Sequence, residues 1–181
     1  MSQFRLIEPP QADPETREQL EAIQNKLGRL PNMFKGMANA PAVLAAYLGM
    51  SEALADSRIS ARLREQVALA VSERNGCHYC LAAHSALGKM LGLGDAEILA
   101  NRRGASADEA TQAALAFAGV LVAKHGQVGA SDVERARQAG FDDGQIAELV
   151  GVTVQTIFTN YFNLTAGIPI DFPKAKVLTT A

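Results

Sequence analysis

Two cysteines and a histidine in one short segment are the residues of this chain best suited to redox chemistry. Cys77 and Cys80 form a Cys-x-x-Cys motif, and His84 follows four residues later. The dipeptide Asn75-Gly76 is a strong helix-ending signal, so a new helix should open at Gly76-Cys77. Both thiols would then lie in its first turn, where free backbone N–H groups and the helix dipole favour a thiolate. Spacings of three and four residues place Cys77, Cys80 and His84 on one helix face.

The helix before this motif carries a carboxylate that could serve the same group. Glu65 lies on a flank of this helix. The centre of the helix, residues 67–71, is apolar on nearly every side. Such a helix is expected to be central in the fold, so the carboxylate could be partly buried and would then need a partner. The natural partner is the Cys/His face of the next helix. Each of these residues alone has an ordinary structural explanation. The combination of Glu65, Cys77, Cys80 and His84 is what favours a catalytic site.

The composition indicates an ordinary globular chain. The 181 residues are 48% hydrophobic and 20% charged, with a net charge of -2, which suits one domain and excludes a mainly disordered chain. The near-neutral charge, the 6% aromatic content and the lack of Trp argue against a nucleic-acid surface. The start does not resemble a signal peptide, and no window approaches the ~20 apolar residues that cross a bilayer. We expect a cytoplasmic protein without a membrane or nucleic-acid partner. In that reducing compartment, a close Cys pair is more often catalytic or metal-binding than structural.

Apolar residues recur at helical spacing along most of the chain. The pattern predicts helices at residues 15–28, 41–56, 60–75, 76–91, 95–101, 110–124, 133–139 and 145–166, with a break at residues 30–32. Ser60 can cap its helix, and residues 106–109, 131–134 and 142–145 fit capping boxes that would begin at Ser106, Ser131 and Asp142.

The last predicted helix also has strand propensity, because residues 152–159 are rich in Val, Thr and Ile. A helix is favoured because the run is too long for an ordinary strand. One helical stripe also runs along the segment through Ile146, Leu149, Thr153, Ile157, Tyr161 and Leu164. We therefore predict an all-α, single-domain helical bundle over residues 1–181, with irregular ends at 1–14 and 168–181.

The segment around the cysteines resembles a known family. Residues 64–71 (Arg-Glu-Gln-Val-Ala-Leu-Ala-Val) and 75–84 (Asn-Gly-Cys-His-Tyr-Cys-Leu-Ala-Ala-His) are similar to the alkylhydroperoxidase D-like proteins of the carboxymuconolactone decarboxylase superfamily. The likeness extends more loosely to residues 30–32, 92–94 and 160–173. It implies an all-helical fold and a homo-oligomer, commonly a trimer or a hexamer. The founding type has a His directly before the second Cys, where this chain has Tyr79 and carries His78 one place earlier.

The resemblance implies a peroxidase whose catalytic residues are Glu65, Cys77, Cys80 and His84. Glu65 would act as the base, and His84 would relay a proton away from Cys80, directly or through a water. The Cys80 thiolate would attack a hydroperoxide, and Cys77 would convert the resulting sulfenic acid into a disulfide. A lipoyl or thioredoxin-like dithiol would then reduce that disulfide. The order of the two thiols follows the family pattern, since spacing alone does not set it, and the scheme uses no cofactor or metal.

Three other functions could use the same residues. A decarboxylase acting on a lactone carboxylate would not depend on the Cys pair. A metal site could take Cys77, Cys80 and His84 with His78, His125 or a carboxylate, although zinc sites usually draw ligand pairs from separate segments. A non-enzymatic thiol–disulfide sensor would need to react only once.

Several further side chains are left without a chemical role by the sequence. Tyr47, Phe158 and Tyr161 are expected to be core or subunit contacts. Asn160 and Asn163 could line a site near the chain end, but nothing in the sequence assigns them a role.

Overall fold

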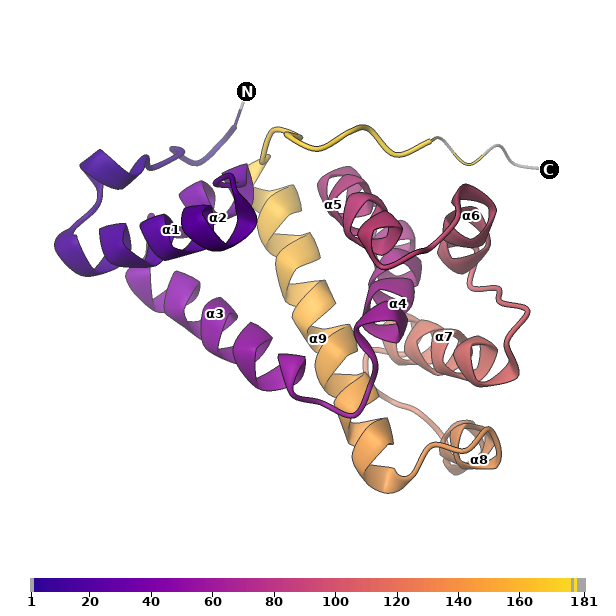
Figure 1. Cartoon of the computed structure of the whole chain (residues 1–181). Coiled ribbons are helices and arrows are strands. Elements are labelled where there is room, and N and C mark those ends of the chain that lie inside the picture. Colours follow the sequence, from indigo (N-terminus) through magenta and orange to yellow (C-terminus); the bar gives the residue numbers. More distant parts are fainter. Residues whose placement is uncertain (1, 177, 179–181) are drawn as a thin grey trace.

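The computed structural model describes residues 2–176 and 178, and every regular element in that part of the chain is a helix (Figure 1). The elements are the 3-10 helix η1 (Pro9–Gln11) and the α-helices α1 (Pro14–Leu27), α2 (Asn32–Met37), α3 (Pro41–Ala55), α4 (Ala61–Arg74), α5 (His78–Met90), α6 (Asp95–Arg102), α7 (Glu109–Ala123), α8 (Ala130–Gln138) and α9 (Asp143–Ala166). All eight predicted helices are present, which confirms the all-α prediction. Among the described residues, no helix combines the length and hydropathy that a bilayer crossing requires.

Helix α4 is the central element of the fold. Its seven residues from Gln66 to Ser72 are all buried. It packs against α5, α6, α7 and α9, because a helix that is apolar on every side has to be covered on every side. This confirms the central position expected from residues 67–71. In Figure 1, α9 lies between α3 and α4, and it contacts both.

The predicted caps are partly right. The Ser60 side chain accepts the N–H of Leu63 at 3.1 Å, as predicted. Asp142 and Gln145 form the predicted capping box, with reciprocal hydrogen bonds of 2.9 and 3.1 Å. These three bonds satisfy N–H groups that a helix start leaves free.

Two caps were predicted wrongly, and one helix, α2, was not predicted. Asp108, not Ser106, caps α7, because its carboxylate accepts the N–H of Thr111 at 2.8 Å. Helix α8 begins after Gly129 rather than at Ser131, since Asp132 reaches back to the Gly129 N–H at 3.0 Å. In both cases a carboxylate, which the helix dipole also favours, serves the first turn in place of the serine. Helix α2 follows the predicted break at residues 30–32, and its six residues are too few to show a helical period.

Helix α9 is helical throughout, as predicted over strand, but its buried face differs in the second half. Ile146, Leu149 and Thr153 are buried as expected. Tyr161 and Leu164 are 56% and 46% exposed, so the predicted stripe is wrong there. The buried positions are instead polar: Thr156, Thr159, Asn160 and Asn163. Polar side chains can hydrogen-bond the buried polar groups of α4 and α5, which apolar residues could not satisfy.

The two ends are less regular than the body, as predicted for residues 1–14 and 168–181. The first stretch nevertheless contains η1 and the start of α1 at Pro14, because proline is favoured at a first helical position. After α9, the described residues form neither helix nor strand, but Asp171 accepts hydrogen bonds from Arg29 and from the Asn32 N–H at 2.6 and 3.0 Å. Residues 1, 177 and 179–181 of the predicted ends lie outside the described residues.

Candidate active site

The turn between α4 and α5 fixes the position of the first sulfur. Gly76 has a left-handed backbone with φ 66°. Its N–H donates to the Glu73 carbonyl at 3.1 Å, and the N–H of Cys77 donates to the Ser72 carbonyl at 3.0 Å. These two bonds close α4 with a Schellman motif. Because α5 begins at His78, Cys77 both completes that motif and occupies the N-cap of the next helix.

Both sulfurs are buried at the start of α5. Cys77 and Cys80 are 1% and 2% exposed, and a disulfide joins them across a Cα–Cα distance of 5.3 Å. The Cys77 sulfur accepts the backbone N–H of Cys80 at 3.3 Å, as an N-cap acceptor does. The predicted helix start and the inward direction of the thiols are therefore confirmed. In the reduced protein, the same N–H and the helix dipole would stabilise a Cys77 thiolate.

The predicted acid and imidazole lie together beside this turn. Glu65 Oε2 of α4 is 2.7 Å from His84 Nδ1 of α5, with side chains 17% and 20% exposed. An ionised carboxylate only accepts hydrogen bonds, so Nδ1 carries the proton in this pair. Nε2 is then left as the basic nitrogen. Among the described residues, no hydrogen bond joins His84 to either sulfur, although His84 lies one turn after Cys80 on the same helix.

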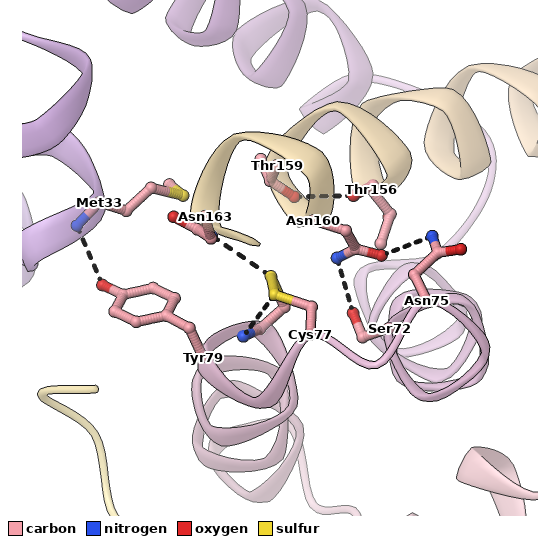
Figure 2. The surroundings of a disulfide bond; sticks show 10 residues. Met33, Ser72, Asn75, Cys77, Tyr79, Thr156, Thr159, Asn160 and Asn163 are labelled. Atoms are coloured by element: carbon pink, nitrogen blue, oxygen red, sulfur yellow. Dashed lines mark hydrogen bonds between the residues drawn. A yellow bond between two sulfur atoms is a disulfide. The ribbon is translucent and has the colours of Figure 1, made fainter. Parts of the chain in front are cut away.

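Helix α9 brings two buried amides to the same place (Figure 2). Asn163 Nδ2 donates to the Cys80 sulfur at 3.3 Å. Asn160 donates to Ser72 Oγ at 3.1 Å and accepts from Asn75 Nδ2 at 2.9 Å. The first amide thus contacts the disulfide, and the second ties the α4–α5 turn to α9. The sequence analysis assigned neither a role, yet polar residues at 153, 156, 160 and 163, at helical spacing within an otherwise apolar helix, were a usable signal.

Tyr79, which stands where the founding type has His, is directed away from the sulfurs. Its hydroxyl accepts the N–H of Met33 at 3.2 Å (Figure 2). Its ring packs edge-on against Phe172, with 5.7 Å between the ring centroids. Burial raises the pKa of Tyr79 far above its ordinary value, so the phenol is neutral. His78 is exposed. The position before the second Cys therefore serves packing between α5, α2 and the C-terminal segment.

Tyr47, which the sequence analysis expected to be a core or subunit contact, also lies near the site. Its ring does contact Phe34 and Phe158, at 5.8 and 6.4 Å between centroids. Burial first and the negative charge of Glu65 second raise the pKa of Tyr47 to about 12, against a hydrogen bond with Ser51 that lowers it. The proximity of Tyr47 to Glu65 depends on how α3 packs, which no local sequence pattern reveals.

The histidines considered as a fourth metal ligand do not join the cysteines. Within residues 2–176 and 178, no three His, Cys, Asp or Glu side chains come together as a metal site requires. His125 lies at the end of α7, in a cavity of about 410 Å³ that it shares with Val150, Val154 and Tyr161. The described residues therefore offer no site of the kind proposed in that alternative.

Comparison with known proteins gives a consistent picture. The sequence profile of the carboxymuconolactone decarboxylase family matches residues 41–124, which include all four predicted catalytic residues. No curated protein matches the chain. An uncharacterised peroxidase-related protein from Silicibacter sp. TM1040 has a solved structure that is 30% identical with a TM-score of 0.78, covering 93% of this chain and 94% of that one.

Two other solved structures share the fold. One is an alkylhydroperoxidase AhpD core, an uncharacterised peroxidase-related protein from Ralstonia eutropha JMP134, with 24% identity, a TM-score of 0.85 and coverage of 94% and 92% of the two chains. The other is the debrominase Bmp8 in complex with 2,3,4-tribromopyrrole, with 21% identity, a TM-score of 0.74 and coverage of 87% and 86%.

The left-handed backbone of Gly76 gives a prediction for its replacement. An added Cβ would meet nothing within 4 Å, so Gly76→Ala changes only the backbone preference. We expect a loss of about 1–2 kcal/mol in the free energy of unfolding. Each kcal/mol corresponds to about 2–4 °C in Tm for a domain of this size. Thermal unfolding checks this.

The matched control is Gly49→Ala in α3, where an added Cβ also meets nothing within 4 Å. At an interior helical position the same substitution should stabilise by about 0.5–1 kcal/mol. Equal shifts in the same direction for the two variants would contradict the role of the turn.

The raised pKa of Tyr47 predicts a stability change at high pH. The folded protein keeps this proton up to about pH 12, whereas the unfolded chain loses it near 10. The stabilisation is therefore complete below pH 10 and is lost as the pH rises towards 12. The difference in unfolding free energy between wild type and Tyr47→Phe should shrink over this window, by at most about 1.4 kcal/mol per pH unit. Denaturant unfolding from pH 9 to 12 measures it, and parallel curves for the two proteins would refute it.

Proposed function

Because the chain belongs to the alkylhydroperoxidase D-like proteins of the carboxymuconolactone decarboxylase superfamily, we propose that it is an oxidoreductase that reduces hydroperoxides through Cys77 and Cys80. The observation that carries the proposal is the 2.7 Å hydrogen bond between Glu65 and His84, on the two helices that frame a buried Cys pair. A base, a proton carrier and two thiols are the groups that such a peroxidase needs.

The first half-reaction oxidises Cys80. His84, with its imidazole oriented by Glu65, takes the proton of the Cys80 thiol, directly or through a water. The thiolate attacks the terminal oxygen of the hydroperoxide, so that an S–O bond forms and the O–O bond breaks. The alkoxide leaves and takes the proton from the imidazolium to become an alcohol. Sulfur has lost two electrons and is a sulfenic acid, while the peroxide has gained them.

The second half-reaction restores the thiols. The Cys77 thiol attacks the Cys80 sulfenic acid, the S–S bond forms, and its proton leaves with the hydroxyl as water. The 5.3 Å between the two Cα atoms allows this bond within one turn of helix. A dithiol partner of lipoyl or thioredoxin-like chemistry then reduces the disulfide by exchange and is itself oxidised. Such a cycle suits the reducing environment of the cytoplasm, where we place the protein.

We also propose that the protein acts as a homo-oligomer, a trimer or a hexamer. One face of α9 supports this, because it carries four large apolar side chains between 37% and 56% exposed: Val154, Phe158, Tyr161 and Leu164. A second copy could remove such a stripe from water. We further propose that residues 1–181 form one domain.

The competing functions make different use of the site. A decarboxylase would give the buried disulfide no role, and a sensor that reacts once would not need a base to accelerate each turnover. Turnover with a recycling dithiol separates the peroxidase from the sensor, and activity that survives loss of both thiols would favour the decarboxylase.

The cysteine variants test the proposal directly. The wild type should consume hydroperoxide continuously with a dithiol donor, and it should lose both free thiols after one equivalent of peroxide. Cys80→Ser should reduce consumption to that of the uncatalysed mixture. Cys77→Ser should stop at a sulfenic acid that a trapping reagent captures. Thiols that persist in the wild type, together with no trapped sulfenic acid in Cys77→Ser, would refute the peroxidase.

Removal of the Glu65 carboxylate, which orients and charge-balances His84 as it takes the proton, should slow the oxidation step. Glu65→Gln is expected to lower the rate of thiol oxidation by roughly 10²–10⁴-fold, the usual contribution of general acid–base catalysis. Stopped-flow measurement of peroxide reduction by the pre-reduced protein provides this rate. The control is Glu73→Gln on the same helix, whose carboxylate pairs with Arg102 at 2.7 Å. Equal rates in Glu65→Gln and Glu73→Gln would remove Glu65 from the mechanism.

A further inference from the structure

The amide of Asn163 is the one side chain from outside α4 and α5 that donates a hydrogen bond to a sulfur in the described part of the chain. We propose that Asn163 is a catalytic residue that holds Cys80 as a thiolate and thereby makes Cys80, rather than Cys77, the attacking sulfur. This inference rests on the proposed function for its meaning, but its test does not require turnover.

The contact is well sheltered from water. Asn163 is 3% exposed and Cys80 is 2% exposed, with 3.3 Å between Nδ2 and Sγ. A disulfide sulfur is a weak acceptor, so the bond contributes little in the oxidised state. A thiolate is a charged acceptor, and hydrogen bonds to charged groups are about twice as strong as neutral ones. The amide therefore favours the reduced, ionised form of Cys80 over its other forms.

The two sulfurs differ in where their donors come from. The Cys77 sulfur, at the N-cap, accepts the backbone N–H of Cys80 at 3.3 Å. That bond and the helix dipole would by themselves place the negative charge on Cys77. The sulfur of Cys80 receives its donor from α9, which offsets this preference and leaves the anion on the thiol one turn before His84. Spacing within the motif could not supply this ordering.

The other end of the same amide gives a second observation. Asn163 Oδ1 is buried and has no hydrogen-bond partner among the described residues. An unpartnered buried carbonyl destabilises the fold, so its presence needs an explanation. Because Oδ1 shares a carbon with the nitrogen that contacts Cys80, it lies close to where oxygen joins the sulfur. It is suited to accept the O–H of the hydroperoxide or of the sulfenic acid.

The test measures each thiol alone, from the ultraviolet absorbance of its thiolate as a function of pH. In a Cys77→Ser background, Asn163→Leu should raise the pKa of Cys80 by about one unit or more, since a donor to the charged form is lost. In a Cys80→Ser background, Asn163→Leu should leave the pKa of Cys77 unchanged. Asn163→Gln, which keeps an amide donor, should restore at least part of the Cys80 value.

The control is Asn160→Leu, which removes a buried amide of the same helix that bonds Ser72 and Asn75 and no sulfur. It should lower Tm without moving the pKa of Cys80. The ionisable groups on the surrounding elements stay the same in every comparison: Tyr47, Glu65, His78, Tyr79, His84 and Asp171.

An unchanged Cys80 pKa in folded Asn163→Leu would overturn the assignment, and so would an equal rise in Asn160→Leu. If Asn163→Leu does not fold, Asn163→Ala, which removes the donor without adding bulk or charge, takes its place, and an unchanged value again overturns it. A shifted pKa in a protein that never reduces hydroperoxide would support the contact and refute the proposed function. Peroxide turnover with an unshifted Cys80 pKa would support the proposed function and refute the role of Asn163.

Discussion

The whole arrangement depends on a connection of three residues between α4 and α5. Because Gly76 can adopt a left-handed backbone, the end of one helix becomes the beginning of the next without a loop. The two helices must then run back beside each other, which brings Glu65 to His84. A longer connection would leave the angle between the helices free, and Glu65 would no longer be aligned with His84. The same connection also carries the Cys77 thiol, so the turn that aligns the two helices places one of the two sulfurs as well.

The site combines donors of local and distant origin. The N–H that faces the Cys77 sulfur belongs to Cys80 in the same turn of helix, so the Cys-x-x-Cys motif itself supplies this donor. The amide that faces Cys80 comes from Asn163, 83 residues later in the chain. In a buried setting such hydrogen bonds are stronger than in water, and an unpaired polar group is correspondingly costly. This explains why two buried positions in the second half of α9 are asparagines, Asn160 and Asn163, which hydrogen-bond Ser72 and Cys80.

What the sequence could predict was limited to what is local. The start of α5, the common face of its cysteines and the central place of α4 all follow from spacing within one or two helices. The direction of Tyr79 and the neighbours of Asn163 depend on which helix lies opposite, and no single-helix pattern contains that information. Helix α2 was missed because six residues do not show a period. Asp108 was missed as the cap of α7 because Ser106, two residues earlier, also fits a capping box, and only the hydrogen bond to Thr111 identifies the cap.

The contacts of Tyr79 explain what the tyrosine of this motif does. Tyr79 is fixed between the Met33 N–H and the ring of Phe172, and the guanidinium of Arg29 lies 4.5 Å over that ring. Asp171 accepts from the same guanidinium, so the C-terminal segment is held against α2 and the start of α5. A histidine before the second Cys would add a titratable group near the sulfurs. The buried phenol of Tyr79 stays neutral because burial raises its pKa, so the acidity of the thiols is left to the helix start and α9. The two sulfurs are almost fully buried, so a reagent can reach them only if neighbouring atoms move.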